Sequence, residues 1–196
     1  MGNLRSVQKA FELLGCPATI VRTPAEVRLA DRLILPGVGA FADAIAVLRK
    51  TGLADAVREF INTQRPFLGI CLGLQLLMDR SYEDGEHAGL GVVAGDCVRF
   101  TVDSGPDPLK VPHMGWNSVH WQVPTPLFKD VAMGAHVYFV HSYHVRPADP
   151  GWIAATTDYG GPIVAAVCRN HVMATQFHPE KSQAVGRLIL ANFVRL

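Results

Sequence analysis

The chain of 196 residues is poor in charge of either sign: charged residues make up 18% of it, and the formal net charge is only +1. Lysine and arginine form no dense cluster, so a surface for nucleic acid or anionic lipid has no electrostatic support. No apolar run approaches the roughly 18 residues that a membrane-spanning helix needs, and the first residues show no basic segment followed by an apolar core. These absences lead us to expect a cytoplasmic protein that binds neither nucleic acid nor a membrane.

The cysteines lack the spacing of a disulfide framework or of a zinc site. They are Cys16, Cys71, Cys97 and Cys168. Because no CxxC pair occurs, we expect reduced thiols. His141 and His144 lie three residues apart, where a strand would point them to opposite faces, and no third ligand is spaced to help. We therefore predict no metal site and no cofactor, and one of the cysteines is open to a chemical role.

Apolar residues, in contrast, make up 49% of the chain and occur in short runs. In the first half these runs alternate with helical patterns, which is typical of a parallel sheet covered by helices on both faces. In the second half, short strands are separated by turns rich in Gly, Pro and Asp, which indicates an antiparallel extension of the sheet. The length fits one domain, so we predict a single α/β domain over residues 1–196.

The apolar periodicity also places the individual elements. Helices are expected over residues 4–14, 41–50, 53–64, 72–80 and 182–194. Strands are expected over residues 18–22, 32–35, 66–70, 98–100, 117–121, 136–143, 152–157, 164–168 and 172–176, with Val92 also extended.

Cys71 falls where a predicted strand turns sharply into a predicted helix, within Gly69-Ile70-Cys71-Leu72-Gly73. Such a turn projects the sulfur outward, and a helix N-terminus favours the thiolate. Gly69 and Gly73 would let strand and helix pass close together, as in the glycine-flanked serine elbow of hydrolases. The pattern predicts a nucleophilic cysteine; the alternative is an inert buried cysteine beside two packing glycines.

A second pattern, Gln176-Phe177-His178-Pro179-Glu180, pairs an imidazole with a carboxylate. Pro179 favours an extended backbone at His178, and residues two apart in an extended segment project to the same side. Glu180 is thus placed to orient His178, which with Cys71 would complete a Cys-His-Glu triad. Taken alone, His178 would more often be an ordinary surface or core histidine.

The loop Pro36-Gly37-Val38-Gly39-Ala40-Phe41 follows an apolar strand, at the edge where parallel sheets bind ligands. Its backbone N–H groups, with that of Leu72, are suited to hold the negative oxygen of a tetrahedral intermediate. The alternative is a plain tight turn, and the Lys-Ser/Thr of a phosphate-binding loop does not follow.

Together these motifs resemble those of class I glutamine amidotransferases, which share an oxyanion loop, a cysteine elbow and a terminal H-P-E. Six blocks extend the resemblance, more narrowly, to the glutaminase subunits of imidazole glycerol phosphate synthases. The blocks are Gly2–Val7, Pro36–Phe41, Gly69–Gln75, Pro112–Asn117, Tyr138–Tyr143 and Gln176–Ser182. The resemblance implies a flavodoxin-like fold with a mixed, mainly parallel sheet, helices on both faces and an antiparallel extension.

The resemblance also implies how the chain would act on L-glutamine. Cys71 would attack the carboxamide carbon, His178 would pass the thiol proton to the departing ammonia, and Glu180 would orient His178. The oxyanion and substrate-binding positions would be Val38, Gly39, Leu72, Gln75, His141, Ser142 and Tyr143. The family's glutaminase is normally slow until its partner binds a ribonucleotide, and the expected switch is a turn of the peptide between Val38 and Gly39.

The implied partner is a TIM-barrel cyclase, with which this subunit would form a heterodimer. The cyclase would receive the ammonia through a channel and make imidazole glycerol phosphate and aminoimidazole carboxamide ribonucleotide, in histidine biosynthesis. The positions that match the partner-facing residues are Asn3, Met114, Trp116, Tyr138 and Lys181. Without a partner, these would be aromatic residues packed on a sheet and a solvated lysine.

The start of the chain departs from the family. There an apolar strand runs directly into the Gly2–Val7 block, whereas here only Met1 precedes it. Since that strand lies inside the family's sheet, its loss would leave backbone groups unpaired. We therefore expect the natural protein to begin upstream and this sequence to lack its usual first strand.

Three other functions were weighed against this one. The glutaminase of anthranilate synthase would call for a histidine in place of Leu74. A cysteine hydrolase on the same elbow would need neither Gln75 nor the H-P-E order. A noncatalytic binding subunit is disfavoured by the intact triad.

Overall fold

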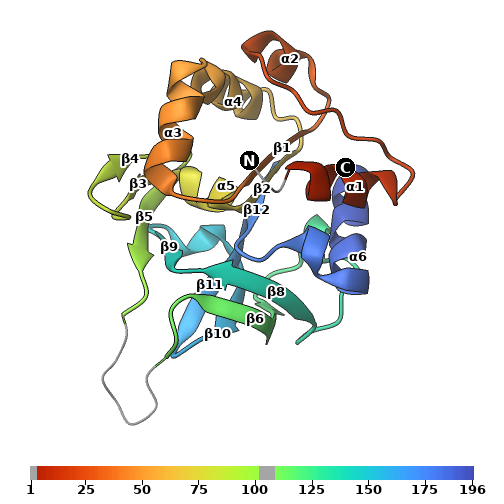
Figure 1. Ribbon diagram of the computed structural model, residues 1–196. Helices are drawn as coiled ribbons and strands as arrows, with labels where there is room; N and C mark the ends of the chain where they lie inside the picture. Colours follow the sequence, from red (N-terminus) through yellow and green to blue (C-terminus); the bar gives the residue numbers. More distant parts are fainter. Residues whose placement is uncertain (1–3, 102–108) are drawn as a thin grey trace.

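In the computed structural model, which describes residues 4–101 and 109–196, a six-stranded mixed sheet forms the centre of the molecule (Figure 1). In spatial order its strands are β1 (Leu33–Gly37), β2 (Phe67–Cys71), β12 (Val172–Thr175), β11 (Pro162–Arg169), β10 (Ile153–Asp158) and β7 (His120–Trp121). The first three run parallel, and the others continue the sheet in antiparallel pairs. The mixed sheet and its antiparallel extension are therefore confirmed.

Helices cover both faces of the parallel part of this sheet (Figure 1). One side carries α2 (Pro24–Leu29), α3 (Phe41–Lys50), α4 (Leu53–Asn62) and α5 (Leu72–Leu76), and the other carries α1 (Leu4–Glu12) and α6 (Gln183–Val194). Each side buries its own apolar cluster: Phe60 belongs to the first, and Phe11 and Phe193 belong to the second. Because it is covered twice, β2 is buried along its whole length, which is why it forms a continuous apolar run.

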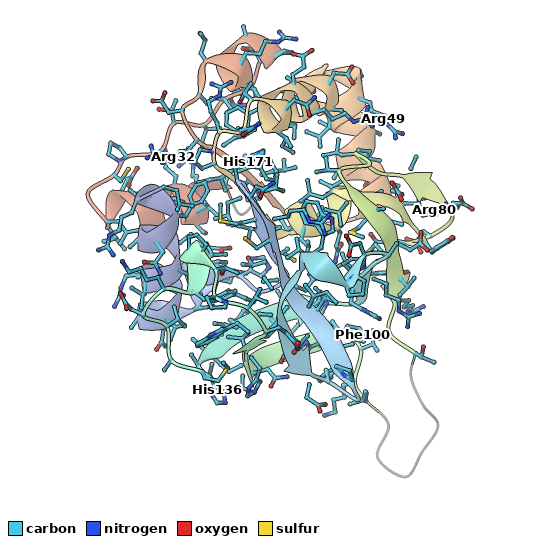
Figure 2. The ribbon with its side chains drawn as sticks, turned by 180° about the vertical axis from the view of Figure 1, so that it is seen from behind. Arg32, Arg49, Arg80, Phe100, His136 and His171 are labelled. Carbon is cyan, nitrogen blue, oxygen red and sulfur yellow. The ribbon has the colours of Figure 1, made fainter. Side chains whose placement is uncertain are left out.

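Two smaller sheets complete the fold. The first joins β4 (His87–Ala88), β3 (Met78–Ser81), β5 (Val93–Arg99) and β9 (Tyr143–Pro147), and the second is an antiparallel ribbon of β6 (His113–Ser118) and β8 (His136–His141). The short turns η1 (Pro126–Phe128), η2 (Pro150–Trp152) and η3 (Pro179–Lys181) are 3-10 helices. Figure 2 shows Arg32 and His171 at the end of the central sheet where β1 and β12 begin, with Phe100 in the other half of the molecule.

Two predictions about the N-terminal part were wrong. Residues 18–22, expected as a strand, pair with no strand in the described part of the chain. Residues 18–21 line a groove of about 550 Å³ together with α1 and β1, and an extended segment that reaches no neighbour cannot form a ladder. The helix Pro24–Leu29 was not expected, although Thr23 and Glu26 form a capping box that is visible in the sequence.

The helix expected over residues 72–80 was too long, because it ends at Leu76. Residues 78–81 form β3 instead, since their backbone pairs with β5 on one side and β4 on the other. Residues 117–121, expected as one strand, are divided between β6 and β7, which belong to different sheets. In each case pairing with distant strands decided the conformation.

Candidate functional site

The elbow at Cys71 joins the end of β2 to the start of α5. Cys71 has φ 54° and ψ −106°, a conformation that is unfavourable for a residue with a side chain. A Cβ atom on Gly73 would lie 1.8 Å from the carbonyl oxygen of Leu35, and one on Gly69 would lie 2.9 Å from the Cβ atom of Ala174. The two glycines are therefore required by the close packing of α5 and β12 around β2, as the sequence predicted.

His178 and Glu180 follow β12, the neighbour of β2 in the sheet. Nδ1 of His178 lies 2.8 Å from Oε1 of Glu180, and both side chains are fully buried. Strand β8 fixes the backbone here, because the N–H of His178 donates to the Tyr138 carbonyl at 2.9 Å. The Ser182 hydroxyl donates to the His178 carbonyl at 2.7 Å and accepts from the N–H of Tyr138 at 3.0 Å. The imidazole is thus held from its backbone and from its ring.

The imidazole of His178 also forms a hydrogen bond with the Cys71 thiol. Burial alone would lower the pKa of His178, but the hydrogen bonds to Cys71 and Glu180, and their charges, outweigh burial and raise this pKa to about 9. The imidazolium is therefore the form present at neutral pH. A cysteine sulfur beside an imidazolium, with a carboxylate behind it, is the arrangement of an activated thiol nucleophile.

Two further groups contact the Cys71 sulfur. The side-chain amide of Gln176 donates to it at 3.7 Å, and the sulfur lies 3.9 Å from the carbonyl oxygen of Val140. The sequence analysis assigned no role to Gln176. The signal was available, because Gln176 lies two residues before His178 and the alternation that was applied to Glu180 applies to it as well.

The other thiols differ from that of Cys71. All four cysteines are free. Cys97 is fully buried in β5, and burial raises the pKa of its thiol to about 12. Cys168 is half-buried, and burial raises the pKa of its thiol as well. Cys71 is thus distinguished by its contact with an imidazolium.

The loop after β1 lies beside the elbow, because Gly37 is opposite Cys71 in the register of the parallel strands. A Cβ atom on Gly37 would lie 2.9 Å from that of Leu72. Val38 is 44% exposed, and Gly39 has φ 100°, a value that favours glycine. The structure therefore brings Val38, Gly39 and Leu72 to the same edge of the sheet.

Gln75, His141, Ser142 and Tyr143 meet on the other side of the elbow. The amide nitrogen of Gln75 donates to the Tyr143 carbonyl at 3.0 Å and to Oε1 of Gln176 at 3.4 Å. Nδ1 of His141 lies 2.8 Å from the same Tyr143 carbonyl. The half-buried Ser142 is the single residue between β8 and β9. All four expected positions thus gather around the sulfur, although the ring of His141 faces the protein interior.

Four of the five expected partner-facing residues form an exposed patch on the β6–β8 ribbon. Met114 and Trp116 are 61% and 46% exposed. Trp116 is opposite Tyr138 in the ribbon, with ring centroids 6.1 Å apart, and the Lys181 ammonium lies 5.8 Å from the Tyr138 ring. Asn3 lies outside the described residues.

Within residues 4–101 and 109–196, no group of three or more His, Cys, Asp or Glu side chains is placed to hold a metal ion. Over the same two ranges, every helix is too short or too polar to cross a membrane.

Comparisons with known proteins agree along nearly the whole chain. A family model described as "Glutamine amidotransferase class-I" matches residues 1–196. The imidazole glycerol phosphate synthase subunit HisH of Syntrophotalea carbinolica is 54% identical over 195 residues, which cover 98% of this chain and 95% of that protein. The subunit of the same name from Rhodopirellula baltica is 52% identical over 193 residues, which cover 98% of this chain and 92% of that protein.

The chloroplastic imidazole glycerol phosphate synthase hisHF of Arabidopsis thaliana is 47% identical over 195 residues, which cover 98% of this chain but only 32% of that protein. Among solved structures, one described as a glutamine amidotransferase has a TM-score of 0.75 at 21% identity, and covers 99% of this chain and 93% of its own. PurLQS of Thermotoga maritima has a TM-score of 0.76 at 17% identity, with 99% and 92% covered. At these identities the solved structures support the fold alone. The chain belongs to the class I glutamine amidotransferases and, within them, to the family of the HisH subunits of imidazole glycerol phosphate synthase.

Proposed function

We propose that this chain hydrolyses L-glutamine to glutamate and ammonia, and that the ammonia passes to a cyclase subunit that makes imidazole glycerol phosphate and aminoimidazole carboxamide ribonucleotide. The observation that carries the proposal is the elbow cysteine, whose sulfur is hydrogen-bonded to an imidazolium that is itself held by a fully buried carboxylate. The choice of synthase is supported by the names of the relatives, which disfavour both anthranilate synthase and an unrelated cysteine hydrolase.

In the proposed reaction, the Cys71 thiolate attacks the carboxamide carbon of glutamine, and the carbonyl oxygen becomes an oxyanion. Backbone N–H groups of the Val38-Gly39 loop and of Leu72 stabilise this charge. His178, protonated because its pKa is raised, gives its proton to the amide nitrogen, and the carbon–nitrogen bond breaks to release ammonia. Water then attacks the thioester, His178 takes up the proton of that water, and glutamate leaves with the thiolate restored.

The buried carboxylate of Glu180 acts through His178. It accepts a hydrogen bond from Nδ1, which fixes the orientation of the ring and stabilises its positive charge. Glu180 is therefore assigned as the orienting member of the triad and not as a proton donor.

The glutamine substrate is proposed to lie between α5 and the junction of β8 and β9. Both amide hydrogens of Gln75 are engaged, with the Tyr143 carbonyl and with Gln176. Its amide oxygen is therefore the group that Gln75 offers to a ligand, and an acceptor suits the α-ammonium group. The backbone of Ser142 and Tyr143 is assigned to the α-carboxylate.

The partner is proposed to be a TIM-barrel cyclase in a heterodimer, bound at the patch formed by Met114, Trp116, Tyr138 and Lys181, together with Asn3. Large exposed aromatic residues are suited to such a role, since they dominate the energetics of many interfaces. The patch adjoins the segment of His178, which supports a short path for ammonia. The cytoplasm is the proposed compartment, because free thiols fit a reducing environment.

The oxyanion loop is proposed to be the switch through which the partner controls turnover. Gly39 has φ 100°, and a Cβ atom placed on it would meet nothing within 4 Å, so the surroundings leave space for the peptide between Val38 and Gly39 to turn. Glutaminase turnover should rise when the cyclase and its ribonucleotide are added. Equal turnover with and without them would contradict this switch.

The decisive experiment compares Cys71→Ala with Cys168→Ala, a change at a second cysteine that lies outside the site. Glutamate release by the complex with the cyclase should fall by at least about 1,000-fold in Cys71→Ala, because the covalent intermediate cannot form. The Cys168→Ala protein should stay within about threefold of wild type. Supplying ammonium salt should restore cyclase product formation in the Cys71→Ala complex. Continued glutamate production by Cys71→Ala would exclude the proposed mechanism.

A further inference from the structure

A line of polar side chains runs from β6 toward the elbow, outside the triad and the oxyanion loop. The amide nitrogen of Asn117 lies 3.3 Å from Nε2 of His113, and Nδ1 of His113 lies 3.0 Å from Nε2 of His141. Nδ1 of His141 then lies 2.8 Å from the carbonyl oxygen of Tyr143. The ribbon register creates this line, because His113 and His141 are direct partners across β6 and β8.

The direction of every hydrogen bond in this line is fixed by backbone groups at its two ends. The Tyr143 carbonyl can only accept, so Nδ1 of His141 donates and its Nε2 must accept from Nδ1 of His113. At the far end, Oδ1 of Asn117 accepts from the N–H of Ser118 at 2.8 Å, and the amide nitrogen donates to the Asp158 carbonyl at 2.8 Å. The remaining amide hydrogen of Asn117 therefore donates to Nε2 of His113.

We propose that His113 and His141 are positioning residues for the glutaminase reaction, which as neutral Nδ1–H tautomers fix the Tyr143 carbonyl and thereby set the donor and acceptor pattern of the glutamine pocket. This inference rests on the function proposed above. It assigns a role to the buried side of β6, the strand whose opposite side carries the exposed Met114 and Trp116.

The same direction continues from Tyr143 to the sulfur. Because the Tyr143 carbonyl accepts, the Gln75 amide must turn its nitrogen toward it, and that nitrogen then meets Oε1 of Gln176. Gln176 is thereby oriented with its own nitrogen toward the Cys71 sulfur. A reversal of either histidine would present a lone pair to a carbonyl oxygen and would release the hydrogen-bond pattern that holds Gln75.

The surroundings of both rings suit neutral, immobile imidazoles. His113 stacks between the rings of Phe139 and Tyr159, at centroid distances of 4.6 and 4.0 Å. Burial lowers the pKa of His113 to about 4 and that of His141 to about 3. Neither ring is therefore available as a proton donor to substrate at neutral pH, which is why positioning and not acid–base catalysis is assigned to them.

The test uses His113→Phe, which keeps an aromatic ring between Phe139 and Tyr159 but removes both nitrogens. In the complex with the cyclase, the KM for glutamine should rise about tenfold, the loss expected for one buried hydrogen-bond network, while kcat stays within about threefold because the triad is untouched. His113→Asn carries a donor at the position of Nδ1 and should restore KM to within about threefold of wild type. His144→Phe is the matched control, because His144 is equally buried but lies outside the line, and its KM should be unchanged.

A second measurement does not depend on any variant folding. Nitrogen-15 NMR of the wild-type full chain with labelled histidine should report both His113 and His141 as neutral with the proton on Nδ1. A proton on Nε2 in either ring, an unchanged KM in His113→Phe, or a fall in kcat as large as the rise in KM would overturn the inference. Absence of any glutaminase activity in the wild-type complex would instead defeat the proposed function and leave the tautomers as a separate observation.

Discussion

The elbow glycine Gly73 offers the most direct test of how the packing creates the site. In Gly73→Ala the new Cβ atom would lie 1.8 Å from the carbonyl oxygen of Leu35, and 2.9 Å from its carbonyl carbon. Ordinary contacts begin at 3.4 Å, so α5 and β1 would have to separate by roughly 1.5 Å. The obstacle is backbone, which cannot rotate away as the end of a side chain can. The substitution therefore moves the start of α5, and with it the position of Cys71.

Two opposing effects determine the magnitude. Alanine is better than glycine inside a helix by about 1 kcal/mol. Overpacking against rigid surroundings costs about 1–3 kcal/mol and more where backbone must shift, so we expect a net loss of about 2 kcal/mol and a fall in Tm of about 4–8 °C for a chain of this size. A displacement of about 1 Å at a reacting group lowers activity by about 100-fold. Glutaminase activity should therefore fall much more than stability alone would imply.

The assay is thermal unfolding together with glutamate release in the presence of the cyclase. Gly151→Ala is the control, because its new Cβ atom would meet only the end of the Arg169 side chain, and it should change stability by less than about 0.5 kcal/mol. If Gly73→Ala kept wild-type activity with a Tm within 2 °C, at roughly the precision expected of such a shift, the argument that the glycine is sterically required would be refuted.

Three further predictions concern pH and the partner. Burial lowers the pKa of three histidines, to about 4 in His113, about 3 in His141 and about 4 in His144. Between pH 6.5 and 4 the unfolded chain binds more protons at these groups, so the free energy of unfolding should fall as pH falls, by about 4 kcal/mol per pH unit at most; equal urea midpoints at pH 7 and pH 5 would contradict this. Glu180→Gln removes a group that raises the pKa of His178, so the alkaline limb of the glutaminase pH profile should move below about 9, and an unmoved limb would argue against the pairing. Trp116→Ala should weaken cyclase binding about tenfold in calorimetry without lowering Tm, because this side chain is 46% exposed, and an unchanged Kd would remove it from the proposed interface.

The predictions that succeeded depend on neighbouring residues. The spacing of Gly69, Cys71 and Gly73 predicts an elbow because the steric requirement acts within five residues, and the structure shows that requirement directly. The pairing of His178 with Glu180 was predicted from two-residue alternation in the same way, and the two side chains lie 2.8 Å apart. Local geometry carries such inferences because it does not depend on which strands become neighbours.

The predictions that failed depend on pairing. Residues 78–81 have the periodicity of a continuing helix, yet β5 and β4 draw them into a sheet. Residues 18–22 have the composition of a strand, yet no neighbour in the described part of the chain pairs with them. Sequence patterns report what a segment can form, whereas the available partners decide what it does form.

The sequence by itself determined the chemistry of this protein: a strained cysteine between two glycines, a histidine with its carboxylate, and a glycine loop after an apolar strand. Only the tertiary structure decided how these parts meet. The order of strands places β12 next to β2 and so brings His178 to Cys71, and the ribbon register places His113 opposite His141. These contacts join residues far apart in the chain, and their geometry follows from sheet order and register, which the packing of the whole domain selects.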